Sequence, residues 1–228
     1  MMPPKDETSA EIQVTPAGPY QVVGGLPLSR TAQDETEFGE PIGYAPLEPV
    51  ETGSSYRLCR CGRSGTKPFC DDSHALDPPF RGSEVADRGP RAARAQTFEG
   101  EGIAITDDKR LCSNAGYCGD RFAHVWEMLA DSADPQVRER IRTMVRLCPS
   151  GRLASSPAPG EAEDEPAYEP EIAVFRDGPI WVRGGVRVVG ADGRPYETRN
   201  RVLLCRCGHS RNRPFCDGTH KMVGFTDD

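Results

Sequence analysis

Short β-type segments dominate the hydrophobic pattern near both ends of the chain. Residues 18–28 (GPYQVVGGLPL) and residues 178–188 (GPIWVRGGVRV) combine alternating β-branched or aromatic residues with a Gly-Gly interruption, which is typical of short strands joined by tight turns. Residues 95–106 (AQTFEGEGIAIT) predict a hairpin with its turn near Gly100–Gly102. We therefore expect small β-rich units.

The centre of the chain has a helical pattern. Residues 121–133 (RFAHVWEMLADSA) look helical, and a second helix is predicted with Asp134 as its N-cap and Pro135 in its first turn. One face of that second helix carries the apolar residues Val137, Ile141, Met144 and Val145. Pro149 ends the helix directly after Cys148.

Two segments have the composition of connections. Residues 155–171 (SSPAPGEAEDEPAYEPE) are rich in Pro, Ala and acidic residues, as linkers are. Residues 88–96 (RGPRAARAQ) carry three arginines, which we interpret as a solvated linker, with a docking patch as the alternative.

The composition excludes several classes of protein. With 228 residues, 36% hydrophobic content, 24 glycines and 21 prolines, the chain is poorly suited to form one large core. Its composition favours several small units, each needing a bound metal or another cross-link for stability. No apolar stretch reaches the roughly 18 residues of a membrane helix, and the first residues lack the pattern of a signal peptide. The net charge of -7 argues against a nucleic-acid partner. We expect a soluble, cytoplasmic protein that binds neither membranes nor nucleic acid.

The nine cysteines indicate three binding sites. An odd number cannot close into disulfides within one chain, and a reducing cytosol would not keep disulfides closed. The cysteines divide without remainder into three triplets: Cys59, Cys61 and Cys70; Cys112, Cys118 and Cys148; and Cys205, Cys207 and Cys216.

The outer triplets belong to an internal repeat. Residues 60–74 (RCGRSGTKPFCDDSH) align without a gap on residues 206–220 (RCGHSRNRPFCDGTH). Each copy has a C-x-C pair and a C-x3-H pair, whereas mixed zinc sites more often use C-x2-4-C. Two tight pairs suit a binuclear cluster with one pair on each metal. The pairs are Cys59 with Cys61 and Cys70 with His74 in the first copy, and Cys205 with Cys207 and Cys216 with His220 in the second.

The pattern C-x-C-x2-S-x3-P-F-C-D-x-[ST]-H resembles the CDGSH iron–sulphur domain, or NEET family. The resemblance implies a [2Fe-2S] cluster bound by three Cys and one His, a small β-cap over the cluster loop, and two units paired about a twofold axis. With both copies in one chain, we expect a monomer that forms an intramolecular pseudo-dimer. Asp72 stands where the motif has Gly; Asp tolerates a positive φ better than most residues, but its charge should lower the potential or the durability of the first cluster.

Residues around each predicted cluster could tune it. Ser64 and Ser210 could donate hydrogen bonds to the sulphurs or support the loop, and Asp217–Thr219 look like the start of a short helix. Imidazole ligation makes the outer iron sensitive to acid, because protons compete with the metal for His74 and His220.

The middle triplet has different spacing. Residues 112–118 (CSNAGYC) and 148–151 (CPSG) resemble the single-cluster ferredoxins, with Ala115 where the middle Cys of C-x2-C-x2-C would stand. The resemblance covers Gln96 to Ser155. It implies a [3Fe-4S] cluster, or a [4Fe-4S] cluster with a non-Cys fourth ligand, on Cys112, Cys118 and Cys148. A zinc site and unrelated buried thiols are the alternatives.

These observations predict an α+β, β-rich fold in five segments. They are a disordered N-terminus (1–15), a first CDGSH domain (16–90, the first repeat), a ferredoxin-like domain (91–156, the middle domain), an acidic Pro-rich linker (157–170) and a second CDGSH domain (171–228, the second repeat). No Ser-His-Asp set, phosphate loop or dinucleotide motif is present, so we expect no enzyme activity. The predicted function is electron transfer with redox partner proteins. The alternatives are transfer, storage or sensing of clusters or iron, with apo-acceptors as partners, and a zinc-stapled interaction module.

Overall fold

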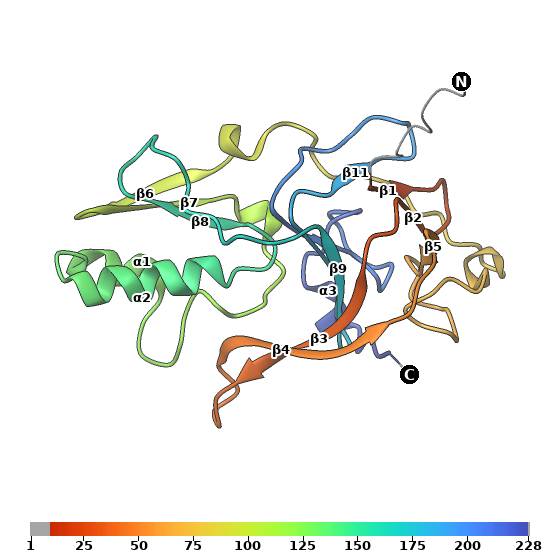
Figure 1. The fold of residues 1–228 in the computed structure, drawn as a ribbon, viewed down its shortest axis with the longest axis horizontal. Coiled ribbons are helices and arrows are strands. Elements are labelled where there is room, and N and C mark those ends of the chain that lie inside the picture. The colour runs from red at the N-terminus through yellow and green to blue at the C-terminus, as the bar shows by residue number, and fades with distance from the viewer. Residues whose placement is uncertain (1–9, 228) are drawn as a thin grey trace, which may run out of the picture.

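The two repeats build two sheets that exchange a strand. The computed structural model describes residues 10–227. In those residues the first sheet has the order β11-β1-β2-β5, and its four strands are labelled in Figure 1. The second sheet has the order β12-β10-β9-β3-β4. The strands of the first sheet are β1 (Glu11–Val14), β2 (Tyr20–Val23), β5 (Ser55–Leu58) and β11 (Arg187–Val189). The strands of the second sheet are β3 (Leu28–Glu35), β4 (Pro41–Val50), β9 (Glu171–Phe175), β10 (Ile180–Arg183) and β12 (Arg201–Leu204).

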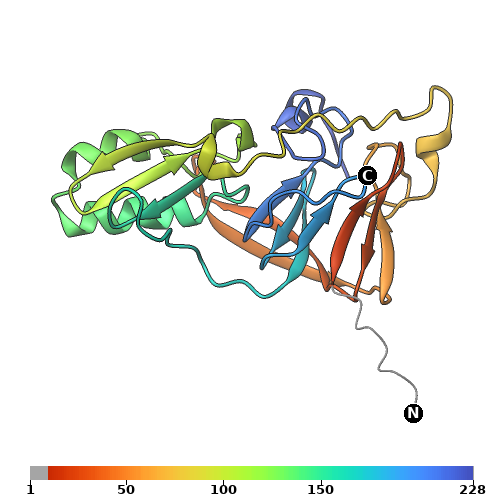
Figure 2. The same ribbon diagram turned by 90° about the horizontal axis from the view of Figure 1, so that it is seen from above.

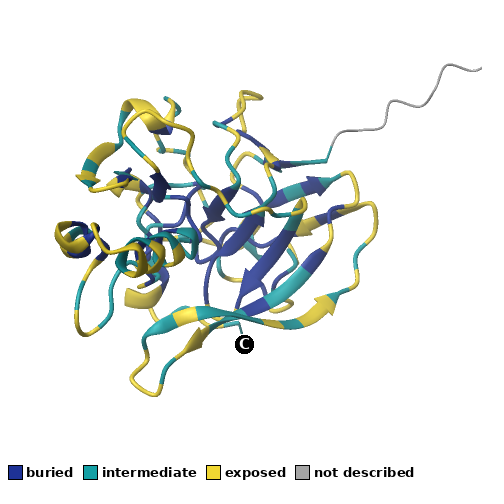
Figure 3. Ribbon diagram, turned by 60° about the vertical axis from the view of Figure 1, so that its left-hand side comes forward, coloured by how far each residue is buried: buried dark blue, intermediate teal, exposed yellow. Residues whose placement is uncertain are grey.

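The strand exchange follows an approximate twofold symmetry. Strand β11 of the second repeat pairs in parallel with β1, with Ile12 opposite Val188. In the same way β3 of the first repeat pairs in parallel with β9, with Leu28 opposite Ile172. Apolar residues of both sheets form one buried core, in which neither repeat is complete alone (Figure 3). The predicted intramolecular pseudo-dimer is confirmed.

The N-terminal prediction needs correction. Residues 1–9 lie outside the described residues, but Glu11–Val14 forms β1 between β2 and β11. Ile12 is fully buried in the shared core. The expected disorder therefore does not extend to residue 15, because the apolar residues of this segment are buried in the core that both repeats share.

The middle domain is a third sheet with helices packed on it (Figure 2). Strands β6 (Gln96–Gly100) and β7 (Ile103–Asp107) form the predicted hairpin, and β8 (Leu153–Ser156) pairs with β7. Helix α2 (Pro135–Arg146) begins as predicted, since the Asp134 side chain accepts a hydrogen bond from the Gln136 N–H. Its buried residues Ile141 and Val145 face the core of this domain.

The other helices are short. Helix α1 (Val125–Met128) covers only part of the predicted residues 121–133, because Asp120 accepts hydrogen bonds from the Phe122 and Ala123 amides and holds the preceding segment as a turn. Helix α3 spans Thr219–Met222. The 3-10 helices span Ser73–Ala75, Arg91–Ala93, Lys109–Leu111 and Leu129–Asp131. None of the helices in the described residues has the length and apolar character needed to cross a bilayer.

The two connecting segments, residues 88–96 and 157–170, contact the rest of the protein instead of lying free in solvent. Residues 157–170 contain no helix or strand, yet Glu163 pairs with Arg91, Asp164 with Arg146 and Glu165 with Arg201. The Arg91 side chain is only 8% exposed. The interpretation of the arginine segment as a solvated linker is therefore wrong, because its charges are neutralised by acids from elsewhere in the chain.

Candidate metal-cluster centres

Each repeat brings its four predicted ligands into one loop. The Cys59 amide donates to the Pro68 carbonyl and the Cys70 amide to the Arg57 carbonyl, so the loop folds back beside β5. Cys205 and Cys216 make the equivalent bonds beside β12, to Pro214 and Leu203. This closure places residues that are about ten positions apart at one end of the same strand.

The ligand atoms form two pairs in each loop. The Sγ atoms of Cys59 and Cys61 are 3.8 Å apart, and Cys70 Sγ is 3.5 Å from His74 Nδ1. In the second repeat the Cys205–Cys207 distance is 3.8 Å, and Cys216 Sγ is 3.4 Å from His220 Nδ1.

The pairs are too far from each other for a single ion. Ligands of one tetrahedral zinc ion, each about 2.0–2.3 Å from the metal, lie within about 4 Å of one another. Among the described residues, no three of the predicted ligand atoms at any of the three sites lie within 4.8 Å of one another. The donor sets therefore fit sulphur-bridged clusters, in which different ligands bind different irons, better than single metal ions.

The paired thiols are prepared for metal binding. Within each pair one thiol donates a hydrogen bond to the other, which lowers the pKa of Cys59 in the first repeat and of Cys207 in the second. The hydrogen bond favours the thiolate, which is the form that binds metal. Burial lowers the pKa of His220 to about 4, so this imidazole is neutral and able to coordinate.

The two loops lie back to back. Gly62 has φ +81°, and a Cβ there would lie 2.6 Å from the Cys207 carbonyl oxygen. Gly208 has the same φ and would meet the Cys61 carbonyl oxygen at 2.7 Å. Only glycine allows both the backbone conformation and this approach. The two predicted clusters are therefore separated by directly packed backbone.

The arginine inside each C-x-C pair supports its loop. Arg60 is buried and donates to the carbonyls of Gly18 and Thr15 at 2.8 Å. Arg206 donates in the same way to Gly178 and Phe175, at 2.9 and 2.8 Å. This role was not predicted from the sequence, although the presence of arginine at the same position in both copies was a signal for it.

The loop serines support the backbone. Ser64 and Ser210 donate their hydroxyls to the carbonyls of Phe69 and Phe215, both at 2.7 Å. The hydroxyls thus take the loop-supporting role and not the role of donors to sulphur. The sulphurs of Cys70 and Cys216 instead accept backbone N–H groups, from Asp72 and Gly218 at 3.4 Å.

The two sites differ in exposure. Cys216 and His220 are only 4% and 8% exposed, whereas Cys70 and His74 are half-buried. The middle domain causes the difference, since a Cβ at Gly218 would lie 2.7 Å from the Ser113 carbonyl oxygen and from the Asn114 side chain. At the equivalent position Asp72 has φ +67° and an exposed side chain, which pairs with Arg57 at 2.7 Å.

The middle cysteines surround a cavity of about 280 Å³. Cys112, Cys118, Cys148 and Ala115 line it together, and no His, Asp or Glu of the described residues does so. Arg152 donates to Cys112 Sγ at 3.0 Å and is held by two hydrogen bonds to Asp107 at 2.6 and 2.8 Å. The cavity suits a cluster with three cysteine ligands and a neighbouring positive charge.

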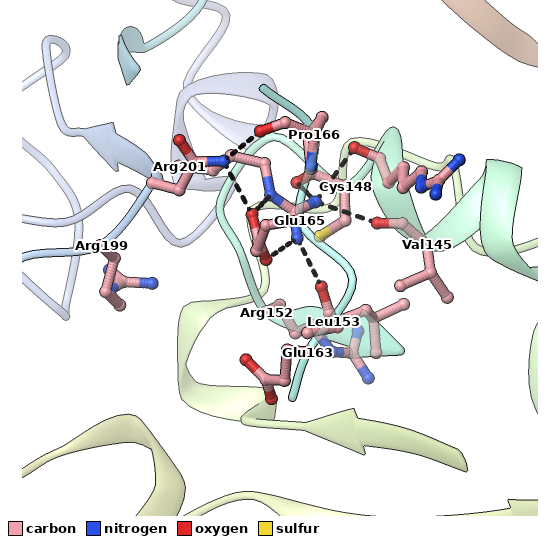
Figure 4. Close-up of polar contacts among 12 residues, drawn as sticks. Val145, Cys148, Arg152, Leu153, Glu163, Glu165, Pro166, Arg199 and Arg201 are labelled. Carbon is pink, nitrogen blue, oxygen red and sulfur yellow. Dashed lines mark hydrogen bonds and ion pairs between the residues drawn. The ribbon is translucent and has the colours of Figure 1, made fainter. Parts of the chain in front are cut away.

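Arg201 ties this site to the second repeat (Figure 4). Its fully buried guanidinium comes from β12 and donates to the Cys148 carbonyl at 2.8 Å and to the Leu153 carbonyl at 3.0 Å. It also donates to the last carbonyls of α2 and pairs with Glu165. The sequence offered no local signal for this contact.

Comparison with known families agrees with this geometry. Residues 17–75 and 177–221 match the family described as "Iron-binding zinc finger CDGSH type". Residues 98–156 match the family described as "Divergent 4Fe-4S mono-cluster". No curated protein matches the chain. Both resemblances inferred from the motifs are confirmed, while the assignment of single ligands stays a prediction.

Proposed function

Because this chain carries two CDGSH domains with a divergent 4Fe-4S domain between them, we propose that it is an electron carrier with three clusters. Each repeat holds one [2Fe-2S] cluster on three Cys and one His. The middle domain holds one [3Fe-4S] or [4Fe-4S] cluster. The protein has no catalytic residues of its own and exchanges single electrons with redox partner proteins.

The contact between the middle site and the second repeat is the observation that carries this proposal. Cys112 Sγ is 3.5 Å from the Asn114 side-chain oxygen, and the Asn114 amide packs on Gly218. The Gly218 N–H in turn lies 3.4 Å from Cys216 Sγ. Ligands of two different sites are thus joined by one bridging side chain and one backbone amide. Since electron tunnelling slows steeply with the gap between centres, this continuous packing favours transfer between them.

The series of packed sites continues from the second repeat to the first. Their loops touch through Gly62 and Gly208, which pack against the carbonyls of Cys207 and Cys61. The order of the centres is therefore middle domain, second repeat, first repeat. Half-buried ligands lie at both ends of this series, in the middle domain and in the first repeat, so these two ends are the sites at which electrons are exchanged with partners.

The cavity lining supports a middle cluster with an incomplete set of protein ligands. Ala115 lines the cavity where a fourth cysteine would stand. The iron nearest to it is then absent, or it takes a ligand from solution. The Arg152 guanidinium beside Cys112 stabilises the more negative, reduced state and so raises the reduction potential.

A second candidate function is delivery of clusters or iron to apo-acceptors. The exposure of His74 favours it, because an accessible imidazole ligand is the weakest point of the cluster. This function concerns the first repeat, since His220 is enclosed.

Freeze-quench electron paramagnetic resonance tests the electron-carrier proposal. The loaded full chain receives less than one electron from a photoreductant, and the spectra of the three clusters are followed with time. We expect the electron to redistribute among the clusters within one molecule, at a rate independent of protein concentration. A concentration-dependent rate would show that electrons move only between molecules and would overturn the relay. Delivery predicts instead that intact cluster passes to an apo-ferredoxin.

A further inference from the structure

The first repeat gathers three different ligand types around one point. A Cys70 sulphur, an Asp72 carboxylate oxygen and a His74 ring nitrogen all lie within 4.8 Å of one another. Cys70 Sγ is 3.5 Å from His74 Nδ1 and 3.9 Å from Asp72 Oδ1. Among residues 10–227 this is the one group of three or more Cys, His or carboxylate ligands that is so close.

These separations match a single tetrahedral metal ion. With bonds of about 2.0 Å to nitrogen and oxygen and about 2.3 Å to sulphur, neighbouring ligands of zinc lie about 3.5 Å apart. Mixed S, N and O donors suit divalent zinc, iron and cobalt. Three protein ligands leave a fourth position for water.

The Asp72 carboxylate is held in place for this role. Arg57 donates to Oδ1 at 2.7 Å and to Oδ2 at 3.2 Å, and each oxygen keeps a further lone pair for a metal. The hydrogen-bonding partners of a ligating carboxylate normally orient it in this way. The left-handed backbone of Asp72 also directs its own N–H to Cys70 Sγ at 3.4 Å.

The second repeat cannot form this group. Gly218 occupies the equivalent position and has no side chain, and a Cβ there would lie 2.7 Å from Ser113 and Asn114 of the middle domain. Of the equivalent three residues, only Cys216 and His220 offer ligand atoms, which lie 3.4 Å apart. The chain therefore contains its own control for the effect of Asp72.

We propose that the first repeat has a second metal-binding mode, in which Cys70, Asp72 and His74 bind one divalent transition-metal ion when the cluster is not assembled. Binding displaces the proton of the Cys70 thiol to solvent and involves no change of oxidation state. Water fills the fourth position. The half-exposed site exchanges its ion with solution, so the first repeat retains or accepts a single metal ion where the second does not. The proposal does not depend on electron transfer.

Cobalt binding tests the proposal on the full chain. The double variant Cys59→Ser, Cys61→Ser cannot assemble the first cluster, and its remaining cluster absorption reports that the rest of the chain is folded and loaded. We expect it to bind one Co²⁺ with a high-spin signal in electron paramagnetic resonance. Adding Asp72→Gly should weaken that binding at least about tenfold. The mirror variant Cys205→Ser, Cys207→Ser, which has Gly218, should bind Co²⁺ as weakly as the Asp72→Gly protein.

Equal Co²⁺ affinity with and without Asp72, equal affinity in the mirror variant, or no Co²⁺ binding would overturn the proposal.

A second measurement needs no change to the cluster ligands. The clusters of the unaltered chain and of Asp72→Gly are broken down anaerobically in excess dithionite, which keeps the released iron ferrous, in the presence of a weak iron(II) chelator, and retained iron and sulphide are measured. We expect the unaltered chain to keep one more iron per molecule after its sulphide is lost. Equal iron retention would contradict the proposal.

Discussion

Arg201 of the second repeat donates a 2.8 Å hydrogen bond to the carbonyl oxygen of Cys148, a predicted ligand of the middle cluster. The guanidinium is fully buried, and Glu165 neutralises its charge. The domain that resembles a ferredoxin is therefore not an independent unit on a tether. The backbone of its predicted ligand Cys148 is held by the strand that leads into the loop of the second repeat.

Arg201→Met should strongly destabilise the protein. The substitution leaves Glu165 and the carbonyls at the end of α2 without their donor, and breaking a buried ion pair costs about 3–5 kcal/mol. The free energy of unfolding is measured by urea titration followed by tryptophan fluorescence. Arg187→Met is the matched control, because the 50% exposed Arg187 pairs with Glu11 at the surface and should contribute at most about 1 kcal/mol. Similar losses in both variants would refute this role of Arg201.

Gly62→Ala should separate the two cluster loops. The added Cβ must displace the Cys207 carbonyl, which would lie at 2.6 Å, and alanine must also adopt φ +81°. Gly25→Ala isolates the backbone effect, since Gly25 has φ +69° with no atom within 4 Å of its Cβ position. We expect a loss of about 1–2 kcal/mol for Gly25→Ala and a larger loss for Gly62→Ala, which should also weaken cluster binding in the second repeat. Iron content and unfolding curves measure both effects; indistinguishable variants would show that the loops need no close contact.

Acid should release the first cluster before the second. Protonation of an imidazole competes with iron, so cluster loss accelerates as the pH falls below about 6.5. Burial lowers the pKa of His220 to about 4, so this imidazole is protonated only at more acidic pH. His74 is half-buried, so solvent has easier access to the first cluster than to the second. Visible absorbance after a drop in pH should therefore decay in two phases. His74→Cys should remove the faster phase and His220→Cys the slower one, and a single phase affected equally by both variants would be inconsistent with the asymmetry.

Ala115→Cys should complete the ligand set of the middle cluster. Ala115 lines the cavity beside the three cysteines, at the position of the missing ligand in the C-x2-C-x2-C pattern. We expect the variant to hold a [4Fe-4S] cluster whose fourth iron resists chelators. In the unaltered protein and in the control Ala115→Ser, that iron should be absent or chelatable. Mössbauer spectra before and after chelation distinguish these states, and identical spectra for all three proteins would mean that Ala115 does not face the cluster.

Local sequence patterns predicted the parts of this protein that depend on local chemistry. The ligand pairs, the hairpin at 96–107 and the helix that starts after Asp134 all follow from spacing, turn residues or capping. Contacts between distant segments were not predictable in this way. Nothing around Arg201 or Glu165 in the sequence indicates that they meet, and β1 was missed because its partners β2 and β11 are set by the tertiary fold. The close packing of Gly218 against the middle domain could not be predicted either, since the loop that it contacts lies about a hundred residues earlier in the chain.

The proposed electron transfer requires sulphur-bridged iron in all three centres. The decisive measurement is iron, zinc and acid-labile sulphide analysis of anaerobically purified protein, combined with electron paramagnetic resonance before and after reduction. We expect coloured protein with iron and sulphide in near-equal amounts, and signals from the [2Fe-2S] centres that appear on reduction. Colourless protein that contains zinc and no sulphide would contradict it.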